Sequence, residues 1–260
     1  MIAGAALTPT LAGYQVKGEL NSSGMNLVYL AEDVRLGRRV AVKVLRRPMA
    51  FDERHRRKFL RECLIAANLD HPRIVPVYAA GEADDVPYFV MPYLPGGDLQ
   101  NMVDVHGPLP LDLTITVVTQ LAEALDYVHA RGLVHRDVKP KNVLVDTTSG
   151  TRCYLSDFGI ATGVDERPGA RPFAGSLGFS PPEQVGGQVV DGRADVYALG
   201  CLLYVCLTGM EPHGPRRSVL ALRPDLPSSL DAVIRKAMAP RPADRHRTSG
   251  RLSEALRQIR

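Results

Sequence analysis

Two short motifs near the middle of the chain carry side chains suited to phosphoryl transfer. Residues 135–142 read HRDVKPKN, and residues 157–159 read DFG. Phosphoryl transfer needs a carboxylate that orients a hydroxyl, a cation near the phosphate, and oxygen ligands for magnesium. The first motif supplies an aspartate, a lysine and an asparagine, and the second supplies another aspartate. We therefore interpret the motifs as a phosphoryl-transfer site; the alternative is a charged surface loop between two strands.

The segments that must position these motifs differ on the two sides of a loop at residues 95–97. Before this loop, short apolar runs predict strands, and one amphipathic segment predicts a helix. The strands are expected at residues 28–31, 40–45 and 88–91, and the helix at about residues 52–68. The apolar stripe of that helix is expected to comprise Phe59, Leu60, Cys63, Leu64 and Ala67.

After the loop, the chain is expected to be mainly helical. Apolar residues recur at helical spacing in four segments, which predicts helices at about residues 113–129, 195–208, 228–238 and 250–259. Short strands are expected at residues 143–145 and around 154–155. Residues 164–175 are rich in glycine, proline and charge, and they predict a mobile loop.

Composition argues against several classes of protein. The chain has 260 residues, of which 45% are apolar and 23% charged, and its net charge of +4 is too mild to indicate nucleic-acid binding. The basic run at 54–58 could form a patch, but we favour the solvated start of a helix. The longest apolar run, 196–208, is too short to span a membrane, and residues 1–13 lack the basic start of a signal peptide and predict a loose tail. Four cysteines without paired spacing argue against zinc and fit a reducing cytoplasm.

Taken with three further motifs, HRDVKPKN and DFG resemble those of the protein kinase family. VAVK at 40–43 is similar to the family's strand-lysine motif, PPE at 181–183 stands where the family has APE, and the lysine after HRD resembles the serine/threonine branch. SPPEQ at 180–184 resembles the bacterial, eukaryotic-like (Hanks-type) members. The resemblance implies an α+β, bilobed fold. It would have a small β-rich N-lobe with one main helix (about 14–91), a hinge (about 92–97) and a larger, mostly helical C-lobe (about 98–260).

The resemblance also implies the roles of four residues in the two central motifs. Asp137 orients the attacking hydroxyl or accepts its proton, and Lys139 stabilises the charge on the transferring phosphate. Asn142 and Asp157 hold Mg²⁺, or Mn²⁺ in its place, because such hard cations prefer oxygen ligands.

An ATP site follows from the same resemblance. Lys43 is expected to bind the α- and β-phosphates and to pair with Glu62, although a strand lysine taken alone usually points to solvent. The adenine slot, gatekeeper, hinge and ribose positions fall on Val28, Ala41, Leu144, Met91, Leu94 and Asp98. The apolar members of this set would serve equally well as plain core residues.

The nucleotide-covering loop departs from the family pattern. The three glycine positions of GxGxxG hold Asn21, Ser23 and Asn26, and only Gly24 between them is a glycine. Glycines there let the backbone approach phosphate and adopt positive φ, which asparagine tolerates better than most residues. We expect weakened or altered ATP binding by this loop, and the departure supports a pseudokinase-type binding module as an alternative.

The segment after DFG is unusual as well. No Ser, Thr or Tyr lies between Gly163 and Gly175. Since a phosphorylated residue there often pairs with the arginine of HRD in related kinases, we hypothesise that Arg136 is held instead by Asp165 or Glu166, or that a partner orders the loop.

Several scaffold contacts are implied too. Ser176 is expected to contact the aspartate and lysine of HRDVKPKN, Asp195 to brace the backbone of that loop, and Glu183 to pair with Arg245. Residues 210–222 are expected to hold at most a short helix, because their prolines and glycine interrupt it.

The leading hypothesis is a cytoplasmic serine/threonine protein kinase of bacterial signalling, which passes the γ-phosphate of Mg-ATP to protein hydroxyls. The alternatives are a pseudokinase-type regulatory binding module and a small-molecule phosphotransferase with a kinase-like fold. ATP and protein substrates are the implied partners, and neither nucleic acid nor a membrane segment is expected. A soluble enzyme and the catalytic part of a longer protein both fit, and the oligomeric state is left open.

Overall fold

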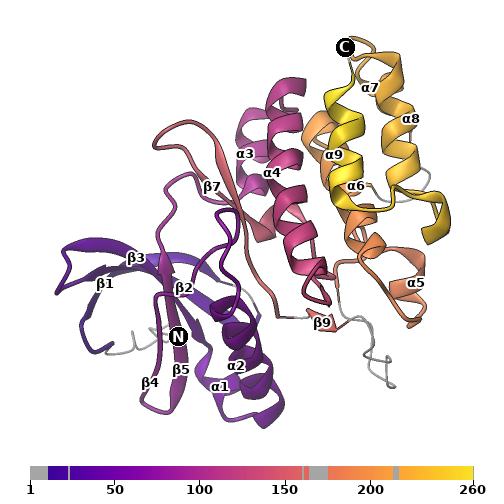
Figure 1. Cartoon of the computed structure of the whole chain (residues 1–260). Coiled ribbons are helices and arrows are strands. Elements are labelled where there is room, and N and C mark those ends of the chain that lie inside the picture. The colour runs from indigo at the N-terminus through magenta and orange to yellow at the C-terminus, as the bar shows by residue number, and fades with distance from the viewer. Residues whose placement is uncertain (1–10, 23, 160, 164–174, 213–216, 260) are drawn as a thin grey trace, which may run out of the picture. The chain divides into compact units, whose positions relative to one another are not determined.

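The computed structural model describes residues 11–22, 24–159, 161–163, 175–212 and 217–259. The chain divides into two compact units (Figure 1). The smaller unit comprises the residues up to Asp70 together with Val75–Leu94, and the larger one comprises His71–Ile74 and the residues from Pro95 onward.

The smaller unit already includes the last residues of the expected tail. Leu11 is buried, and the carbonyl oxygen of Gly13 accepts a hydrogen bond from Val34 N at 3.0 Å. Residues 11–13 are therefore part of the packed unit, whereas the rest of the expected tail lies outside the described residues.

A five-stranded antiparallel sheet forms the body of the smaller unit, in the order β1-β2-β3-β5-β4. The strands are β1 (Tyr14–Ser22), β2 (Asn26–Asp33), β3 (Arg38–Leu45), β4 (Ala79–Ala83) and β5 (Val86–Pro92). β3 is the central strand, and residues 40–45 are buried on both of its faces. This burial explains why the VAVKVL run is apolar at all but one position.

Two helices accompany the sheet, α1 (Arg47–Ala50) and α2 (Glu53–Ala67). The carboxylate of Asp52 caps α2 by accepting a hydrogen bond from Arg54 N at 2.8 Å, so the predicted start of this helix is confirmed.

The buried face of α2 differs from the predicted stripe. Phe59, Glu62, Cys63 and Ala66 are buried, whereas three members of the predicted stripe are exposed: Leu60, Leu64 and Ala67. The prediction was wrong at these three positions because it followed the apolar residues alone and left Glu62, although expected to pair with Lys43, beside the stripe. Burial of this carboxylate against a lysine of β3 rotates the packed face by about one residue, to the i, i+3, i+4, i+7 set that begins at Phe59.

The larger unit is mostly helical and contains two small two-stranded sheets, β6 with β9 and β7 with β8. Its first elements are α3 (Leu99–His106), α4 (Leu111–His129), β6 (Leu133–Val134), the 3-10 turn η1 (Pro140–Asn142), β7 (Val143–Asp146), β8 (Arg152–Leu155) and β9 (Thr162–Gly163). They are followed by α5 (Pro182–Val185), α6 (Arg193–Thr208), α7 (Val219–Leu222), α8 (Ser228–Ala237), the 3-10 turn η2 (Pro242–Asp244) and α9 (Ser249–Arg257).

α6 lies at the centre of this unit, in contact with α4, α7, α8 and α9. Every residue from Ala194 to Leu207 is buried, as expected of a helix that is apolar on all sides. Within the described ranges, no helix is both long enough and apolar enough to cross a membrane.

The predicted helices correspond to α4, α6, α8 and α9, each within about two residues at either end. α3 was not predicted, because its eight residues span only about two turns and offer too few apolar positions to establish a helical period. Residues 210–222 contain only the four-residue α7 among their described positions, in line with the expected short helix. Most of the predicted mobile loop, residues 164–174, lies outside the described residues.

All four cysteines are buried free thiols: Cys63, Cys153, Cys201 and Cys206. Burial raises the pKa of Cys153 to about 12, and it also raises the pKa values of Cys63 and Cys206. These side chains therefore act as small, unreactive core residues.

Gly200 marks the tightest packing of α6. A Cβ added there would lie 2.8 Å from Ala237 Cβ and 2.9 Å from Met238 Cγ. We expect Gly200→Ala to lower the free energy of unfolding by about 1–3 kcal/mol, because crowding in a packed core outweighs the gain in helix propensity. Chemical denaturation followed by circular dichroism measures this change. The matched Gly18→Ala adds a Cβ at an exposed position with nothing within 4 Å, and an equal effect of the two substitutions would contradict the packing argument.

Candidate active site

One buried carboxylate holds the start of the 135–142 loop. Asp195, in the first turn of α6, is fully buried. Its Oδ2 accepts hydrogen bonds from His135 N at 2.9 Å and from His129 Nε2 at 2.7 Å, and its Oδ1 accepts one from Arg136 N at 2.8 Å. Burial alone raises the pKa of Asp195, but the hydrogen bond and charge of His129, with the backbone bonds, bring it below its ordinary value. The predicted brace is confirmed.

His129, the last residue of α4, completes this brace. Burial lowers its pKa, but the hydrogen bond with Asp195 and the charges of Asp195, Asp126 and Asp191 raise the pKa above its ordinary value on balance. Its ring lies against Gly192, where an added Cβ would approach Nδ1 to 2.7 Å. The lack of a side chain at Gly192 therefore lets the imidazole reach the carboxylate.

Two non-glycine residues near the site have left-handed backbone. Arg136 has φ of 70° and Asp157 has φ of 65°. Such a conformation costs about 1–2 kcal/mol per residue relative to a right-handed one. At Arg136, the hydrogen bonds that Asp195 accepts from this residue and its neighbour offset the cost.

His135 joins the two motifs. It is fully buried; its Nε2 lies 3.0 Å from the carbonyl oxygen of Ser156, and its Nδ1 accepts a hydrogen bond from Asp137 N at 3.3 Å. With Nδ1 accepting from Asp137 N, Nε2 is placed to donate to the Ser156 carbonyl. The ring also packs edge-on against Phe158 of DFG, with centroids 4.7 Å apart.

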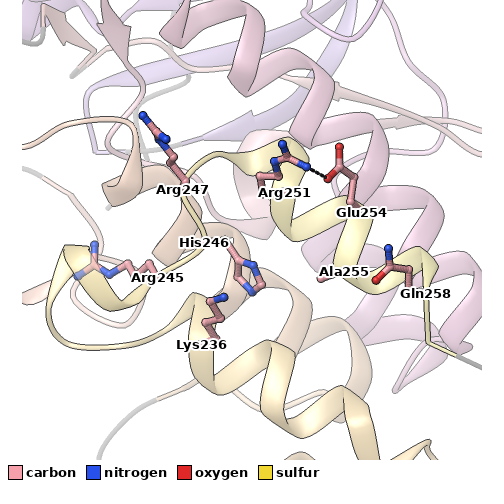
Figure 2. Close-up of a pocket in the computed structure, with 8 residues that line it drawn as sticks. All are labelled: Lys236, Arg245, His246, Arg247, Arg251, Glu254, Ala255 and Gln258. Atoms are coloured by element: carbon pink, nitrogen blue, oxygen red, sulfur yellow. Dashed lines mark hydrogen bonds and ion pairs between the residues drawn. The ribbon is translucent and has the colours of Figure 1, made fainter.

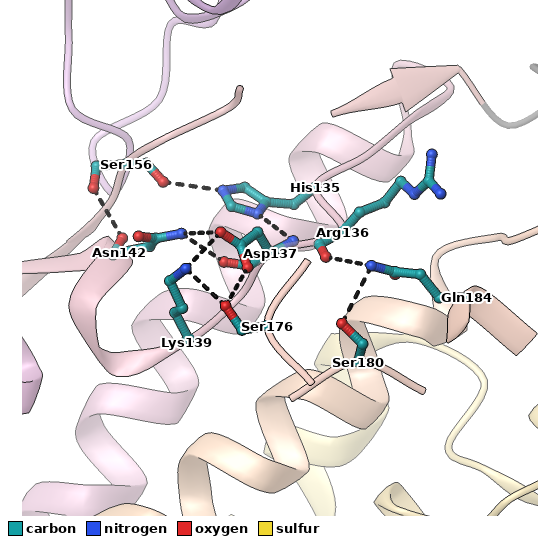
Figure 3. Close-up of polar contacts among 9 residues, drawn as sticks. All are labelled: His135, Arg136, Asp137, Lys139, Asn142, Ser156, Ser176, Ser180 and Gln184. Carbon is teal, nitrogen blue, oxygen red and sulfur yellow. Dashed lines mark hydrogen bonds and ion pairs between the residues drawn. The ribbon is translucent and has the colours of Figure 1, made fainter. Parts of the chain in front are cut away.

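Asp137 is the centre of a compact polar cluster (Figure 3). Its Oδ2 lies 2.8 Å from Lys139 Nζ and 3.0 Å from Asn142 Nδ2, and its Oδ1 accepts a hydrogen bond from Ser176 Oγ at 3.0 Å. Lys139 Nζ also donates to Ser176 Oγ at 2.8 Å, so the expected contact of Ser176 with both side chains is confirmed. The carboxylate remains partly exposed, with 15% of the side-chain surface accessible.

The predicted metal ligands lie on adjoining segments. Ser156, which precedes Asp157, donates to the carbonyl oxygen of Asn142 from its backbone N at 2.9 Å and from its Oγ at 3.0 Å. Asn142 Nδ2 donates to Asp137, so its amide oxygen faces away from that carboxylate. The donor set is all oxygen, which fits a hard divalent cation. Within the described chain, no group of three or more His, Cys, Asp or Glu residues is arranged to hold a metal.

The smaller unit holds a buried ion pair at the predicted lysine. Lys43 Nζ of β3 lies 2.5 Å from Glu62 Oε1 of α2, and both residues are buried. The Lys43 ammonium also lies 5.7 Å from the ring centroid of Phe89, against which Phe59 of α2 packs. The lysine is thus fixed in place, and its role in ATP binding stays a prediction.

The other residues predicted to contact ATP are distributed over both units. In the smaller unit, Val28 lies on β2, Ala41 on β3 and Met91 on β5, the last two buried, and Leu94 is its last residue. Leu144 lies on β7 of the larger unit and is half-buried.

Asp98 has a structural role that the sequence did not indicate. It is the N-cap of α3, and its Oδ1 accepts a hydrogen bond from Asn101 N at 2.8 Å. The ribose contact predicted for this carboxylate would have to coexist with the cap.

The predicted nucleotide-covering loop joins β1 to β2. Asn21 is exposed and pairs across the sheet with Val28, next to a bulge in β1. An added Cβ at Gly24 would meet nothing within 4 Å. Ser23 lies outside the described residues.

Gln184 was not singled out from the sequence. Its Nε2 donates to the carbonyl oxygen of Arg136 at 2.8 Å and lies 3.4 Å from Ser180 Oγ (Figure 3). The sequence feature that could have pointed to Gln184 is its position directly after PPE. The Arg136 side chain itself points away from the Asp137 cluster, and its proposed partners Asp165 and Glu166 lie outside the described residues.

The segment that carries Gln184 is anchored by a buried ion pair. Arg245 donates to Glu183 Oε1 at 2.6 Å and to Oε2 at 2.7 Å, so the predicted pair is confirmed. Arg245 also donates to the carbonyl oxygens of Arg193, Ala239 and Pro240. The guanidinium is therefore fully satisfied, as a buried charge requires.

Comparison with known proteins shows to which family the chain belongs. A family model described as the protein kinase domain matches residues 14–243. The chain belongs to the protein kinase family. Serine/threonine-protein kinase PknB of Mycobacterium leprae is 38% identical over 267 residues, which cover 95% of this chain and 43% of that protein. PrkC of Bacillus subtilis is 36% identical over 252 residues, which cover 91% of this chain and 39% of that protein.

A solved protein kinase structure supports the fold. The crystal structure of the Mycobacterium tuberculosis PknI kinase domain matches with a TM-score of 0.76 at 36% identity, covering 98% of this chain and 99% of that one. The predicted α+β protein-kinase fold is confirmed. Members of this family use ATP with a divalent metal. The chain spans about two fifths of the length of the curated relatives named above.

The His129–Asp195 pair of this kinase predicts a pH dependence of stability. Because folding raises the pKa of His129, its stabilising contribution is complete below the unfolded pKa of about 6.5 and is lost as the pH rises through the folded value. We expect His129→Gln to lower the free energy of unfolding more at about pH 6 than at about pH 9. Urea denaturation at the two pH values measures the difference.

The matched control is His106→Gln, because the side chain of His106 is exposed to solvent. A deficit of His129→Gln that stays constant between the two pH values would contradict a protonated His129 in the folded state.

Proposed function

We propose that this chain is an active serine/threonine protein kinase domain, which transfers the γ-phosphate of Mg-ATP to hydroxyls of proteins in bacterial signalling. The observation that carries the proposal is the Asp137 carboxylate, held by Lys139, Ser176 and Asn142 on a loop that Asp195 braces. A carboxylate restrained in this way is positioned to orient a hydroxyl before attack.

Asp137 performs the step on the substrate hydroxyl. It accepts a hydrogen bond from the hydroxyl and takes the proton as the hydroxyl oxygen bonds to the γ-phosphorus. The bond from that phosphorus to the β,γ-bridging oxygen breaks in the same step, and ADP leaves. Lys139 shares this carboxylate and brings positive charge to the transferring phosphate. Ser176 accepts a hydrogen bond from Lys139 and donates one to Asp137, which keeps the two side chains together. Because the transition state is loose, positioning contributes more than proton affinity.

Binding of the nucleotide is part of the same proposal. Lys43, held by Glu62, contacts the α- and β-phosphates, and Asn142 and Asp157 hold the Mg²⁺, for which Mn²⁺ can substitute. The bound metal neutralises phosphate charge. Base, ribose and covering-loop contacts come from Val28, Ala41, Met91, Leu94, Leu144, Asp98, Asn21, Ser23 and Gly24.

Two further parts of the proposal are the specificity for serine and threonine hydroxyls and the cytoplasmic location of the domain. PknB and PrkC are named serine/threonine-protein kinases, and Lys139 stands after HRD as in that branch. The cytoplasm supplies ATP and keeps thiols reduced, which suits a domain that uses ATP and contains four free thiols. We take its bounds as 14–260, with lobes at about 14–91 and 98–260 joined by a hinge at about 92–97.

Asp137→Asn tests the catalytic assignment. The substitution keeps the shape of the side chain but removes its charge and its ability to take a proton. We expect the rate of phosphate transfer from labelled Mg-ATP to a generic protein acceptor to fall by about 10²–10⁴-fold. The thermal shift caused by Mg-ATP should persist, which separates loss of chemistry from loss of binding. Equal labelling by the variant and the original chain would overturn the proposal.

Lys43→Met tests the phosphate contact separately. Methionine retains most of the apolar stem but has no ammonium, so we expect the affinity for Mg-ATP, measured by calorimetry, to fall by about tenfold or more. Lys17→Met is the matched control, because Lys17 is an exposed lysine of β1 that pairs with Glu32. Unchanged affinity in Lys43→Met would remove Lys43 from the ATP site.

A further inference from the structure

A pocket of about 430 Å³ lies in the larger unit at the end of α8, the segment after η2, and α9 (Figure 2). It is lined by Lys236, Arg245, His246, Arg247, Arg251, Glu254, Ala255 and Gln258. None of these residues belongs to HRDVKPKN or DFG, so the proposed phosphotransfer leaves the pocket unexplained.

The rim of the pocket is positively charged. Lys236 and Arg247 are exposed, and no hydrogen bond or ion pair joins either side chain to the rest of the described chain. Arg251 makes an exposed ion pair with Glu254 at 2.6 Å, drawn as the dashed line in Figure 2. Arg245 is neutralised by Glu183, toward which its guanidinium is turned. The rim therefore carries three solvent-facing cations and one carboxylate, that of Glu254.

The interior of the pocket is neutral. His246 is buried, with Nε2 3.3 Å from the carbonyl oxygen of Val233. Burial lowers the pKa of His246, and the nearby charge of Lys236 lowers it further, so the ring is uncharged at neutral pH. The positive charge available to a ligand thus comes from the rim alone.

The backbone offers no cradle for a single phosphate. The first amides of α9 are already engaged: Ser249 N and Gly250 N donate to Asp126 at 3.0 and 2.9 Å, and Arg251 N donates to Thr248 Oγ1 at 3.2 Å. A phosphate at a helix start would need these N–H groups. An anion here must be bound by side chains.

The arrangement of the cations favours an extended ligand. Lys236 lies on α8, Arg247 in the segment between η2 and α9, and Arg251 on α9, and their charged ends point in different directions (Figure 2). One small anion cannot contact all three, whereas a chain with several carboxylates can. Ala255 leaves room beside α9, and the Gln258 amide can both donate to and accept from a peptide backbone.

We propose that this pocket binds an acidic peptide segment of a protein partner, with Asp or Glu side chains on Lys236, Arg247 and Arg251. Binding requires neither ATP nor phosphate transfer. The proposal therefore stands or fails apart from the catalytic assignment.

Fluorescence anisotropy with a labelled Asp/Glu-rich peptide tests the proposal on the whole chain without ATP. We expect saturable binding that weakens as salt is added, because exposed charge pairs are screened. The matched peptide with Asn and Gln in place of Asp and Glu should not bind. Equal binding of the neutral peptide would overturn the proposal.

Two variants with opposite expected effects on the affinity for the peptide test whether it binds at this pocket. Lys236→Glu with Arg247→Glu should weaken binding by about tenfold, since two rim cations become anions. Glu254→Gln should strengthen binding by about two- to threefold, because it removes a competing carboxylate from Arg251. A structural defect would not strengthen binding, so the second variant separates recognition from misfolding.

Arg54→Glu with Lys58→Glu is the matched control, with the same change in charge on the exposed surface of α2. Equal loss in this control and in the pocket variant would show a non-specific effect of net charge and overturn the site. A phosphoserine peptide of equal net charge that binds more tightly, and loses its binding in the pocket variant, would replace the proposed carboxylate ligand.

Discussion

The hydrogen bonds of the Asp195 carboxylate are the interaction on which the 135–142 loop of the larger unit depends. An ion taken out of water is tolerated only when hydrogen bonds replace its hydration, and here the backbone of His135 and Arg136 supplies two of them. The demand is mutual, because Arg136 keeps its left-handed conformation through the same bonds. The loop shape and the buried charge therefore stabilise each other.

The start of α6 is a common support for two segments distant in sequence. Asp195 holds the loop that carries Asp137, while the neighbouring carbonyl of Arg193 accepts a hydrogen bond from Arg245 at 3.0 Å. Arg245 in turn binds Glu183, next to the glutamine that contacts Arg136. Since α6 is packed on all sides, it gives both segments a rigid base.

In the smaller unit, the corresponding buried charge is the Lys43 ammonium, which lies within an apolar sheet. A buried ion pair contributes little net stability, because the cost of desolvation offsets the attraction. Its benefit here is position: Glu62 fixes Lys43 on the central strand, and Phe89 lies beside the ammonium. The orientation of α2 follows from this pair as well as from Phe59.

Much of this architecture could be predicted from the sequence, because strong periodicity marks α4, α6, α8 and α9 and rare motifs mark the 135–142 loop. The contacts of Asp195, of Ser176 and between Glu183 and Arg245 were also foreseen, through the family pattern. The packed face of α2 was not, since its apolar spacing points to Leu60, Leu64 and Ala67, whereas the buried pair of Glu62 with Lys43 turns Ala66 inward instead. His129 and Gln184 were missed for a related reason: their partners are a distant carboxylate and a backbone carbonyl, which leave no trace in local spacing.

The four buried thiols have a practical consequence. Cys63 belongs to the smaller unit, whereas Cys153, Cys201 and Cys206 belong to the larger one. A thiol-specific reagent can reach such side chains only when the surrounding structure opens. The rate at which each cysteine is alkylated therefore records the opening of its own unit. The chain carries natural reporters with which the order of unfolding of its two halves can be followed without an added label.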